Sequence, residues 1–247
     1  MLSVGTSGWH YRDWRGAFYP PKLPARRWLE HYASRFDTVE LNNTFYRLPT
    51  ADAFRAWRDT VPDDFVFTVK ASRYLTHYRR LRDPHEPVAR LMAAVAGLEG
   101  KLGPILLQLP PDLRVDVDAL AQVLDAFGER VRLVCEFRHE SWYVDGVYDL
   151  LRERDVAVCL ADRRNRHTPL VRTASWGFVR MHEGTATPPP HYGRRALQHW
   201  VDRIGELWGA GADCFVYFNN DHGACAPRDA AAFVALARDA GVGSGLS

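Results

Sequence analysis

The sequence predicts an α/β fold, a single (β/α)8 barrel of the TIM type. Eight short apolar runs recur along its 247 residues, and segments with helical periodicity separate most of them. Apolar strands that alternate with helices are typical of a parallel sheet whose outer face is covered. Eight such units in about 250 residues, with no stretch that resembles a linker, favour a closed barrel. We therefore expect residues 1–247 to form one TIM-barrel domain.

The apolar runs place the eight expected strands in order along the chain. An open, doubly wound sheet is the alternative arrangement, but it usually carries a glycine-rich phosphate turn after an early strand. No GxGxxG spacing is present, which also disfavours a dinucleotide-dependent redox enzyme. The expected strands occupy residues 2–6, 38–42, 66–71, 104–109, 133–137, 157–161, 177–181 and 214–219.

Helices are expected between most of these strands. Apolar positions three and four residues apart mark them, Thr50 and Asp116 are suitable N-caps, and Pro24 and Pro87 stand near helix starts. One regular helix is not expected, because residues 163–175 contain Pro169 and little periodicity, so we expect an irregular connection between strands six and seven. The expected helices occupy residues 24–36, 51–60, 87–98, 117–130, 147–154, 195–208 and 228–240.

Composition excludes several classes of protein. The chain is 47% hydrophobic, 12% aromatic and 25% charged, which is incompatible with disordered, collagen-like and small disulfide-rich proteins. Its 32 basic and 30 acidic residues give a net charge of +2, so no global electrostatic attraction to nucleic acid is expected, although a local basic patch is compatible with this balance. The basic residues comprise 29 arginines and three lysines.

Nothing in the sequence indicates a membrane protein. No apolar stretch approaches the ~18–20 residues of a membrane span, and the N-terminus lacks a charged leader followed by an apolar core. Four cysteines form no CxxC pair, and three of them lie in expected strands, which favours reduced core residues. We expect a soluble, cytoplasmic protein.

Polar residues close seven of the eight expected strands, from the second to the eighth. In a barrel of this type the active site lies at the carboxyl ends of the strands. A polar residue at one strand end is ordinary, but charged groups inside a barrel must be paired, so a cluster of them favours binding or chemistry. The strand-end candidates are Glu40, Asn42, Lys70, Gln108, Glu136, Arg138, Asp162, Arg180, His182 and Asn219.

Glu40, Glu136 and Lys70 are the candidate catalytic residues. Two carboxylates in different environments suit general acid and base chemistry, or each neutralises a barrel cation, Glu40 beside Lys70 and Glu136 near Arg138 or Asp162. Lys70 would act as an electrostatic clamp, a proton donor or, with a depressed pKa, an amine nucleophile. A structural ion pair is the alternative for Lys70.

The cations of the expected mouth favour an anionic small-molecule substrate. Arg138, Arg180 and Lys70 would suit a carboxylate or phosphate. The loops after strands seven and eight, where barrels frequently bind phosphate, supply His182, Gly184, Asn219, Asn220 and Gly223, although such glycines are also ordinary turn residues.

Loop aromatics leave sugar and nucleic-acid binding open as well. Trp9, Tyr11, Trp14, Tyr46 and Trp142 follow strands one, two and five, where they either stack on a ring of the ligand or pack beneath the loops. Nucleic-acid processing would also draw on Arg163, Arg164 and Arg166.

The expected site has no identified cofactor and no metal ion. His77, His139 and His182 lack a spacing that fixes metal ligands, so we expect no metal. The leading hypothesis is a hydrolase or lyase that acts on an anionic or polyhydroxylated small molecule. A metabolite-binding barrel without catalysis is the main alternative.

Six strings carry a resemblance to a known family: VGTSGWHYRDWRGAFYP, FDTVELNNTFYRLP, FTVKASRYLTH, LGPILLQLPP, CEFRHESW and VYFNNDHGACAPRDA. Together they resemble the YecE-like family, domain of unknown function 72, along almost the whole chain. The resemblance implies a TIM-type barrel and no established reaction. Its motif positions correspond to Trp9, Tyr11, Trp14, Glu40, Asn42, Tyr46, Lys70, His77, Gln108, Glu136, Arg138, His139, Trp142, Arg180, His182, Asn219 and Asn220.

Overall fold

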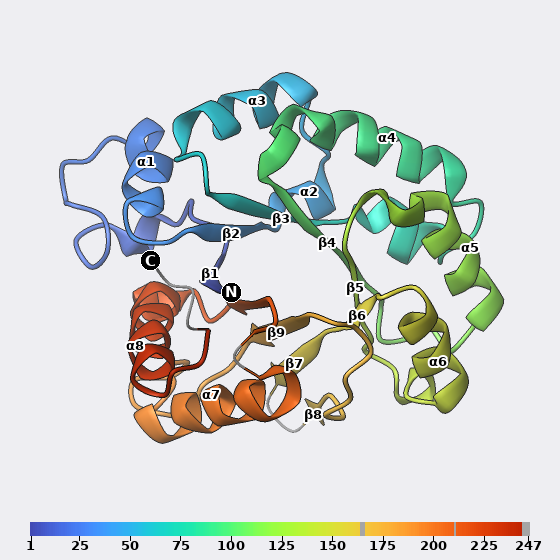
Figure 1. Ribbon diagram of the computed structural model, residues 1–247. Helices are drawn as coiled ribbons and strands as arrows, with labels where there is room; N and C mark the ends of the chain where they lie inside the picture. Colours follow the sequence, from blue (N-terminus) through green and yellow to red (C-terminus); the bar gives the residue numbers. More distant parts are fainter. Residues whose placement is uncertain (164–165, 210, 244–247) are drawn as a thin grey trace.

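A parallel β-barrel surrounded by helices forms the molecule in a computed structural model, which describes residues 1–163, 166–209 and 211–243 (Figure 1). The ten strands of these residues form one sheet in the order β6-β5-β4-β3-β2-β1-β10-β9-β7-β8. All neighbouring pairs are parallel except β7 and β8. The strands are β1 (Leu2–Ser7), β2 (Thr38–Leu41), β3 (Val66–Lys70), β4 (Leu102–Gln108), β5 (Leu133–Glu136), β6 (Ala157–Val158), β7 (Leu160–Arg163), β8 (Arg166–His167), β9 (Gly177–Met181) and β10 (Cys214–Phe218).

The sixth strand of the barrel is divided into two short strands. β6 pairs with β5, β7 pairs with β9, and only Cys159 separates the two. The Cys159 amide donates a hydrogen bond of 2.8 Å to the Cys135 carbonyl, which extends the pairing with β5. The continuous chain through Cys159 therefore joins the two ends of a nearly closed ring, in which β6 and β7 are not paired with each other. The expected TIM-type barrel is confirmed, and the open doubly wound sheet is wrong.

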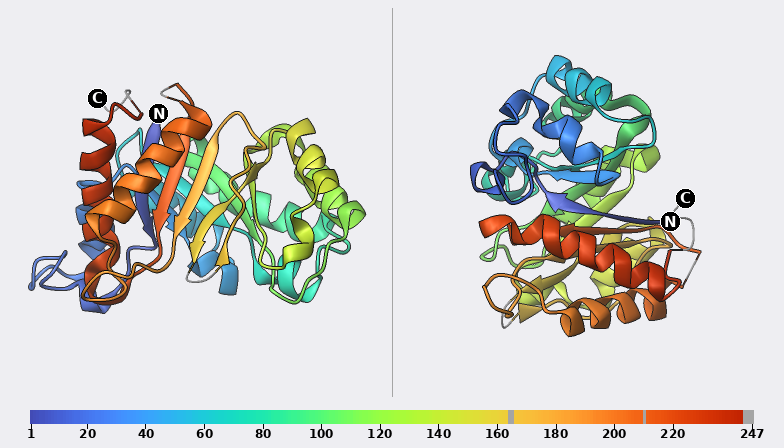
Figure 2. Two further views of the ribbon diagram at one scale, coloured as in Figure 1. Left: turned by 90° about the horizontal axis from the view of Figure 1, so that it is seen from below. Right: turned by 90° about the vertical axis from the view of Figure 1, so that its left-hand side faces the viewer.

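Eight α-helices lie among the described residues, and most of them surround the strands (Figures 1 and 2). Thr50 and Asp116 cap α3 and α5 by accepting hydrogen bonds from the Ala53 and Ala119 amides, as expected. The helices are α1 (Trp28–Ala33), α2 (Asn43–Tyr46), α3 (Ala51–Thr60), α4 (His85–Val95), α5 (Val117–Phe127), α6 (Asp145–Glu153), α7 (Arg194–Trp208) and α8 (Cys225–Asp239).

The connection between strands six and seven is irregular over most of its described length, as expected, but it also contains β8. This two-residue strand pairs antiparallel with β7. Residues 164 and 165 of this connection lie outside the described residues. The proline that argued against a helix, Pro169, lies after β8 in backbone without helix or strand.

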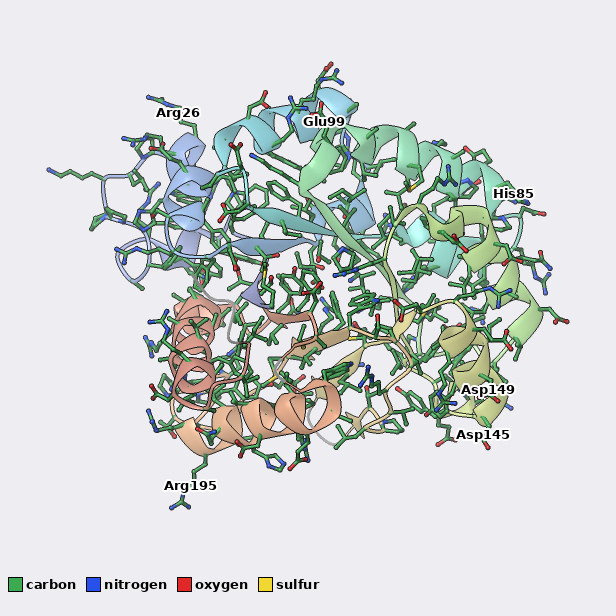
Figure 3. The ribbon with its side chains drawn as sticks, viewed as in Figure 1. Arg26, His85, Glu99, Asp145, Asp149 and Arg195 are labelled. Atoms are coloured by element: carbon green, nitrogen blue, oxygen red, sulfur yellow. The ribbon has the colours of Figure 1, made fainter. Side chains whose placement is uncertain are left out.

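The core has two layers because successive residues of a strand face opposite sides of the sheet. Outward-facing residues such as Val39 and Val69 pack against the helices, whereas Leu106, Phe178 and Tyr217 fill the barrel interior. Charged side chains on the helical layer, such as Arg195, point away from the barrel (Figure 3).

A polar contact lies at mid-height in the barrel interior. The Tyr217 hydroxyl is 2.6 Å from Thr38 Oγ1 and 2.8 Å from Thr68 Oγ1, so it joins β10 to β2 and β3 across the interior. Two residues further along β2 and β3, at the carboxyl ends of the strands, stand Glu40 and Lys70. The interior is therefore filled from below, and the ionisable side chains gather at its upper end.

Candidate functional site

Arg180 forms the centre of a buried ion-pair cluster at the carboxyl ends of the strands. Its guanidinium donates through Nη2 to Glu40 Oε1 at 2.7 Å and through Nη1 to Glu136 Oε2 at 2.5 Å. All three side chains are at most 1% exposed. Because they come from β9, β2 and β5, the cluster joins strands from different sides of the barrel.

Glu136 is held as a carboxylate by three donors. Besides Arg180, Gln108 Nε2 donates to Glu136 Oε2 and Arg138 Nε donates to Glu136 Oε1, each at 3.0 Å. Burial opposes ionisation, but Arg180, His182 and Arg138 outweigh it and lower the pKa of Glu136 well below its ordinary value. Glu136 therefore suits a fixed anion that positions arginines better than a group that exchanges protons near neutral pH.

Glu40 is the less completely satisfied carboxylate. Its Oε1 accepts hydrogen bonds from both Arg180 and Ser7 Oγ, the latter at 2.7 Å. Its Oε2 is buried and has no hydrogen-bond partner among the described residues. The expected neighbour of Glu40 was Lys70, but the structure pairs Glu40 with Arg180, since the guanidinium reaches both carboxylates at once.

Lys70 lies in this cluster without a counter-ion. No hydrogen bond or ion pair of Lys70 Nζ occurs within the described part of the chain, and the nitrogen lies 4.2 Å from the centroid of the Phe45 ring. Burial and the nearby Arg180 lower the pKa of Lys70 to about 8. The structural ion pair considered for Lys70 is absent from the described residues, which leaves its amine for other chemistry.

An outer ring of amide and imidazole groups lies above the ion pairs. Asn219 Nδ2 is 3.0 Å from His182 Nδ1, and Asn42 Nδ2 is 3.5 Å from Asn219 Oδ1. Burial and Arg180 lower the pKa of His182 to about 3, so its ring is neutral at physiological pH. Asn42 Oδ1 and His182 Nε2 are buried without a hydrogen-bond partner among the described residues.

A cavity of about 510 Å³ opens beside Arg138 at the same end of the barrel. The cavity is lined by Arg138 and His139, which follow β5, and by Ala161, Arg163 and Thr168, which lie on β7 or in the connection after it. The arginine side chain, 23% exposed, connects the cavity to Glu136. Of the other basic residues considered for nucleic acid, Arg164 and the side chain of Arg166 lie outside the described residues.

Two predicted candidates on the outer face of the barrel do not join the cluster. Asp162 lies two residues after Leu160 in the same strand, so both side chains face the same side of the sheet. Leu160 belongs to the outer layer of the core, so Asp162 faces outwards as well. Asp162 Oδ2 accordingly accepts a hydrogen bond from Trp200 in α7. Asn220 donates to the Pro190 carbonyl and to Asp229 Oδ2, so it holds the loop before α7.

The loop aromatics mostly serve packing. Trp14 Nε1 donates to the Asp221 carbonyl, and Trp142 Nε1 donates to the Leu113 carbonyl. The ring of Trp9 packs against Trp57 of α3, with centroids 5.5 Å apart. Tyr46, in contrast, is 68% exposed at the rim.

Sequence reasoning missed two contributors to the site. Ser7 is the last residue of β1, and its side chain faces the barrel interior, where it donates to Glu40. The search for polar residues at strand ends would have identified it if the first strand had been included. Asp221 lies two residues beyond Asn219, and burial and Glu40 raise its pKa to about 7, although Tyr11 opposes the shift. A carboxyl group that follows a strand end by a few residues has no period to identify it.

All four cysteines are free and buried. Within residues 1–163, 166–209 and 211–243, no helix combines the length and the apolar character needed to cross a membrane. In the same part of the chain, no three His, Cys, Asp or Glu side chains are grouped closely enough to hold a metal ion.

Comparisons with known proteins agree with this fold. The chain is similar to UPF0759 protein YunF of Bacillus subtilis. The alignment spans 256 residues, gaps included, with 26% identity, and covers 90% of each protein. The chain is 30% identical over 173 residues to UPF0759 protein YecE of Escherichia coli O157:H7, which covers 68% of this chain and 61% of that protein. A crystal structure of a DUF72 family protein from Thermotoga maritima matches with a TM-score of 0.83 and 26% identity, covering 96% of this chain and 99% of that one. The family model described as "Protein of unknown function DUF72" matches residues 3–244, and this chain therefore belongs to the DUF72 family.

Proposed function

We propose that this protein is an enzyme of the hydrolase or lyase type that binds a small anionic molecule at the carboxyl-terminal mouth of its barrel. The observation that carries the proposal is the charge balance of the buried cluster. Three cations, Lys70, Arg138 and Arg180, face two carboxylates that are both paired with arginine, Glu40 and Glu136. Asp221, whose pKa is raised to about 7, offsets this excess of positive charge only in part at neutral pH. An anionic group would neutralise the excess positive charge in a poorly solvated position.

Unsatisfied polar atoms at the mouth support the same conclusion. Glu40 Oε2, Asn42 Oδ1, Arg180 Nε and His182 Nε2 are buried without hydrogen-bond partners among the described residues. Buried polar atoms are usually satisfied, and a group of unsatisfied ones at one place needs an explanation. A substrate with several oxygen atoms, such as a carboxylate or phosphate that also carries hydroxyl groups, would satisfy them.

Thermal unfolding in the presence of small metabolites tests this proposal. We expect carboxylates or phosphates to raise the melting temperature of the wild type more than neutral polyols do, because only the anions compensate the cationic cluster. Arg138→Gln should abolish most of this stabilisation. Arg195→Gln is the matched control, since its side chain projects outward from α7 and should leave the response unchanged (Figure 3). Equal responses to anions and polyols, or no response to either, would contradict the proposal.

Turnover separates an enzyme from a barrel that only binds its ligand. A ligand that stabilises the wild type is incubated with the protein and followed by mass spectrometry. We expect it to be converted, and conversion should be lost in Lys70→Arg while stabilisation by the ligand persists. Recovery of the intact ligand from the wild type would indicate a binding protein.

A further inference from the structure

Lys70 is distinguished from the other cations of the mouth by its surroundings. Arg180 and Arg138 each donate to a carboxylate, whereas Lys70 Nζ contacts the face of the Phe45 ring. Lys70 is 8% exposed, whereas Glu40 and Glu136 are 0% exposed, so Lys70 is more accessible to a ligand than either carboxylate. A buried ammonium without a carboxylate partner loses solvation that one aromatic ring restores only in part.

The groups around Lys70 make its ammonium easier to deprotonate, although with a pKa of about 8 the ammonium still predominates at pH 7. Arg180 on β9 and Arg138 after β5 oppose its positive charge, while Glu40 on β2 and Glu136 on β5 support it. Both carboxylates are already bound by arginine, which weakens their support. His77 packs against Phe45 with ring centroids 4.9 Å apart, and burial and Lys70 lower its pKa, so it adds no charge at neutral pH.

We propose that Lys70 Nζ is a nucleophile that forms a reversible imine with the carbonyl carbon of a small substrate that also carries a carboxylate or phosphate group. The inference rests on the proposed function, because it uses the same mouth and the same anionic class. It narrows that class to carbonyl compounds. The first bond-forming step, attack on the carbonyl carbon, requires a neutral amine that faces the barrel interior. Lys70 is the last residue of β3 and lies on its inward face.

The reaction balances without an oxidant, a reductant or a cofactor. The ammonium first releases one proton, and the neutral amine attacks the carbonyl carbon, so that a C–N bond forms and the carbonyl π electrons move to oxygen. One proton then passes from nitrogen to oxygen and gives a carbinolamine. The released proton returns to the hydroxyl group, which leaves as water while the nitrogen lone pair forms the C=N bond. The sum is ammonium plus carbonyl giving protonated imine plus water.

We assign the mobile proton to Glu40, because its strand β2 pairs directly with β3, which carries Lys70. Its Oε1 is engaged by Ser7 and Arg180, but its Oε2 is buried without a partner in the described part of the chain. A protonated imine withdraws electrons from the adjacent carbon, so bonds at that carbon break more easily. Of the two reaction types proposed, the imine therefore favours the lyase.

Reductive trapping tests this inference directly. The protein is incubated separately with pyruvate, glyoxylate, 2-oxoglutarate and dihydroxyacetone phosphate, reduced with borohydride and analysed by peptide mass spectrometry. Mapping is unambiguous because the chain has only three lysines. We expect at least one probe to alkylate Lys70 at least tenfold more than the exposed Lys22, the partly buried Lys101 or the α-amine of Met1. Lactate has the charge of pyruvate without the ketone and should give no adduct.

Two variants control for folding and for nonspecific alkylation. Lys70→Arg keeps the positive charge over Phe45 but cannot form this imine, so it should fold and give no adduct at position 70. Lys101→Arg should not change trapping at Lys70, since Lys101 donates to the Arg58 and Val61 carbonyls outside the mouth. Absence of a Lys70 adduct with all four probes, or equal alkylation of all amines, would overturn the inference. If anions still stabilise the wild type in that case, the proposed function survives; if they do not, both fail.

Discussion

At the scale of single residues, Arg180 is the side chain on which the buried cluster depends. Replacing it with methionine leaves Glu40 and Glu136 buried without their shared cation. We expect Arg180→Met to lower the free energy of unfolding by about 3–5 kcal/mol, the usual effect of removing one partner from a buried ion pair. Chemical denaturation measures this loss, with the exposed Arg195→Met as control. A loss below about 1 kcal/mol would mean that the carboxylates take up protons or are solvated instead.

Asp221 gives the clearest pH dependence among the site residues. Its pKa is raised to about 7, so the folded state binds its proton more tightly than the unfolded state, whose carboxyl has a pKa near ~3.9. The contribution of Asp221 to the free energy of unfolding of the wild type is therefore fully present below pH ~4 and is lost as the pH rises towards 7. Asp221→Asn removes this loss, because its amide stays neutral.

We accordingly expect Asp221→Asn to be more stable relative to wild type at pH 8 than at pH 4. Denaturant titrations at both pH values measure the difference. The carboxyl of Asp37, whose pKa burial raises to about 6, is present in both proteins and cancels in the comparison. Asp63→Asn, at an exposed carboxylate, should show no such change. A difference that shrinks with rising pH would contradict the assignment.

The alternation of polar and apolar residues along the strands predicted most members of the buried cluster. Where this alternation did not identify a residue correctly, there is a physical cause. In β2 and β3 polar and apolar residues alternate, so the inward positions of Glu40 and Lys70 are visible directly. Around the sixth strand residues 157–161 are all apolar and buried, which hides the parity, and Asp162 falls on the outer face. Pairing partners were also beyond reach, because only the closed barrel brings Arg180 between strands β2 and β5.

At the scale of elements, long amphipathic helices and apolar strands were predictable because each meets the same core along its length. The division of the sixth strand was not, since it reflects pairing with β5 on one side and with β9 on the other. The short helix α2 is likewise too brief for a periodic signal. It nevertheless presents Phe45 to Lys70, so a feature that periodicity cannot detect determines the environment of the amine.

At the scale of the whole molecule, barrel closure explains both the interior and the mouth. Each strand contributes an inner face, so a few apolar side chains fill the centre and the polar residues beyond them are forced together. Closure also means that distant strands have no independent core, because each packs against inner and outer layers shared with its neighbours. The barrel should therefore unfold as one cooperative unit.

The cysteines allow this cooperativity to be measured at several places at once. Cys135 on β5, Cys159 between β6 and β7, and Cys214 on β10 are buried and free, and burial raises the pKa of each thiol, so native thiols should resist alkylation. We expect pulse alkylation along a denaturant series, read by peptide mass spectrometry, to label all three at one midpoint that coincides with loss of tryptophan fluorescence. Labelling of Cys214 at a clearly lower denaturant concentration would instead mean that the strands around β10 separate before the rest. In that case the closure of the barrel would contribute less to its stability than the packing of helices on each segment.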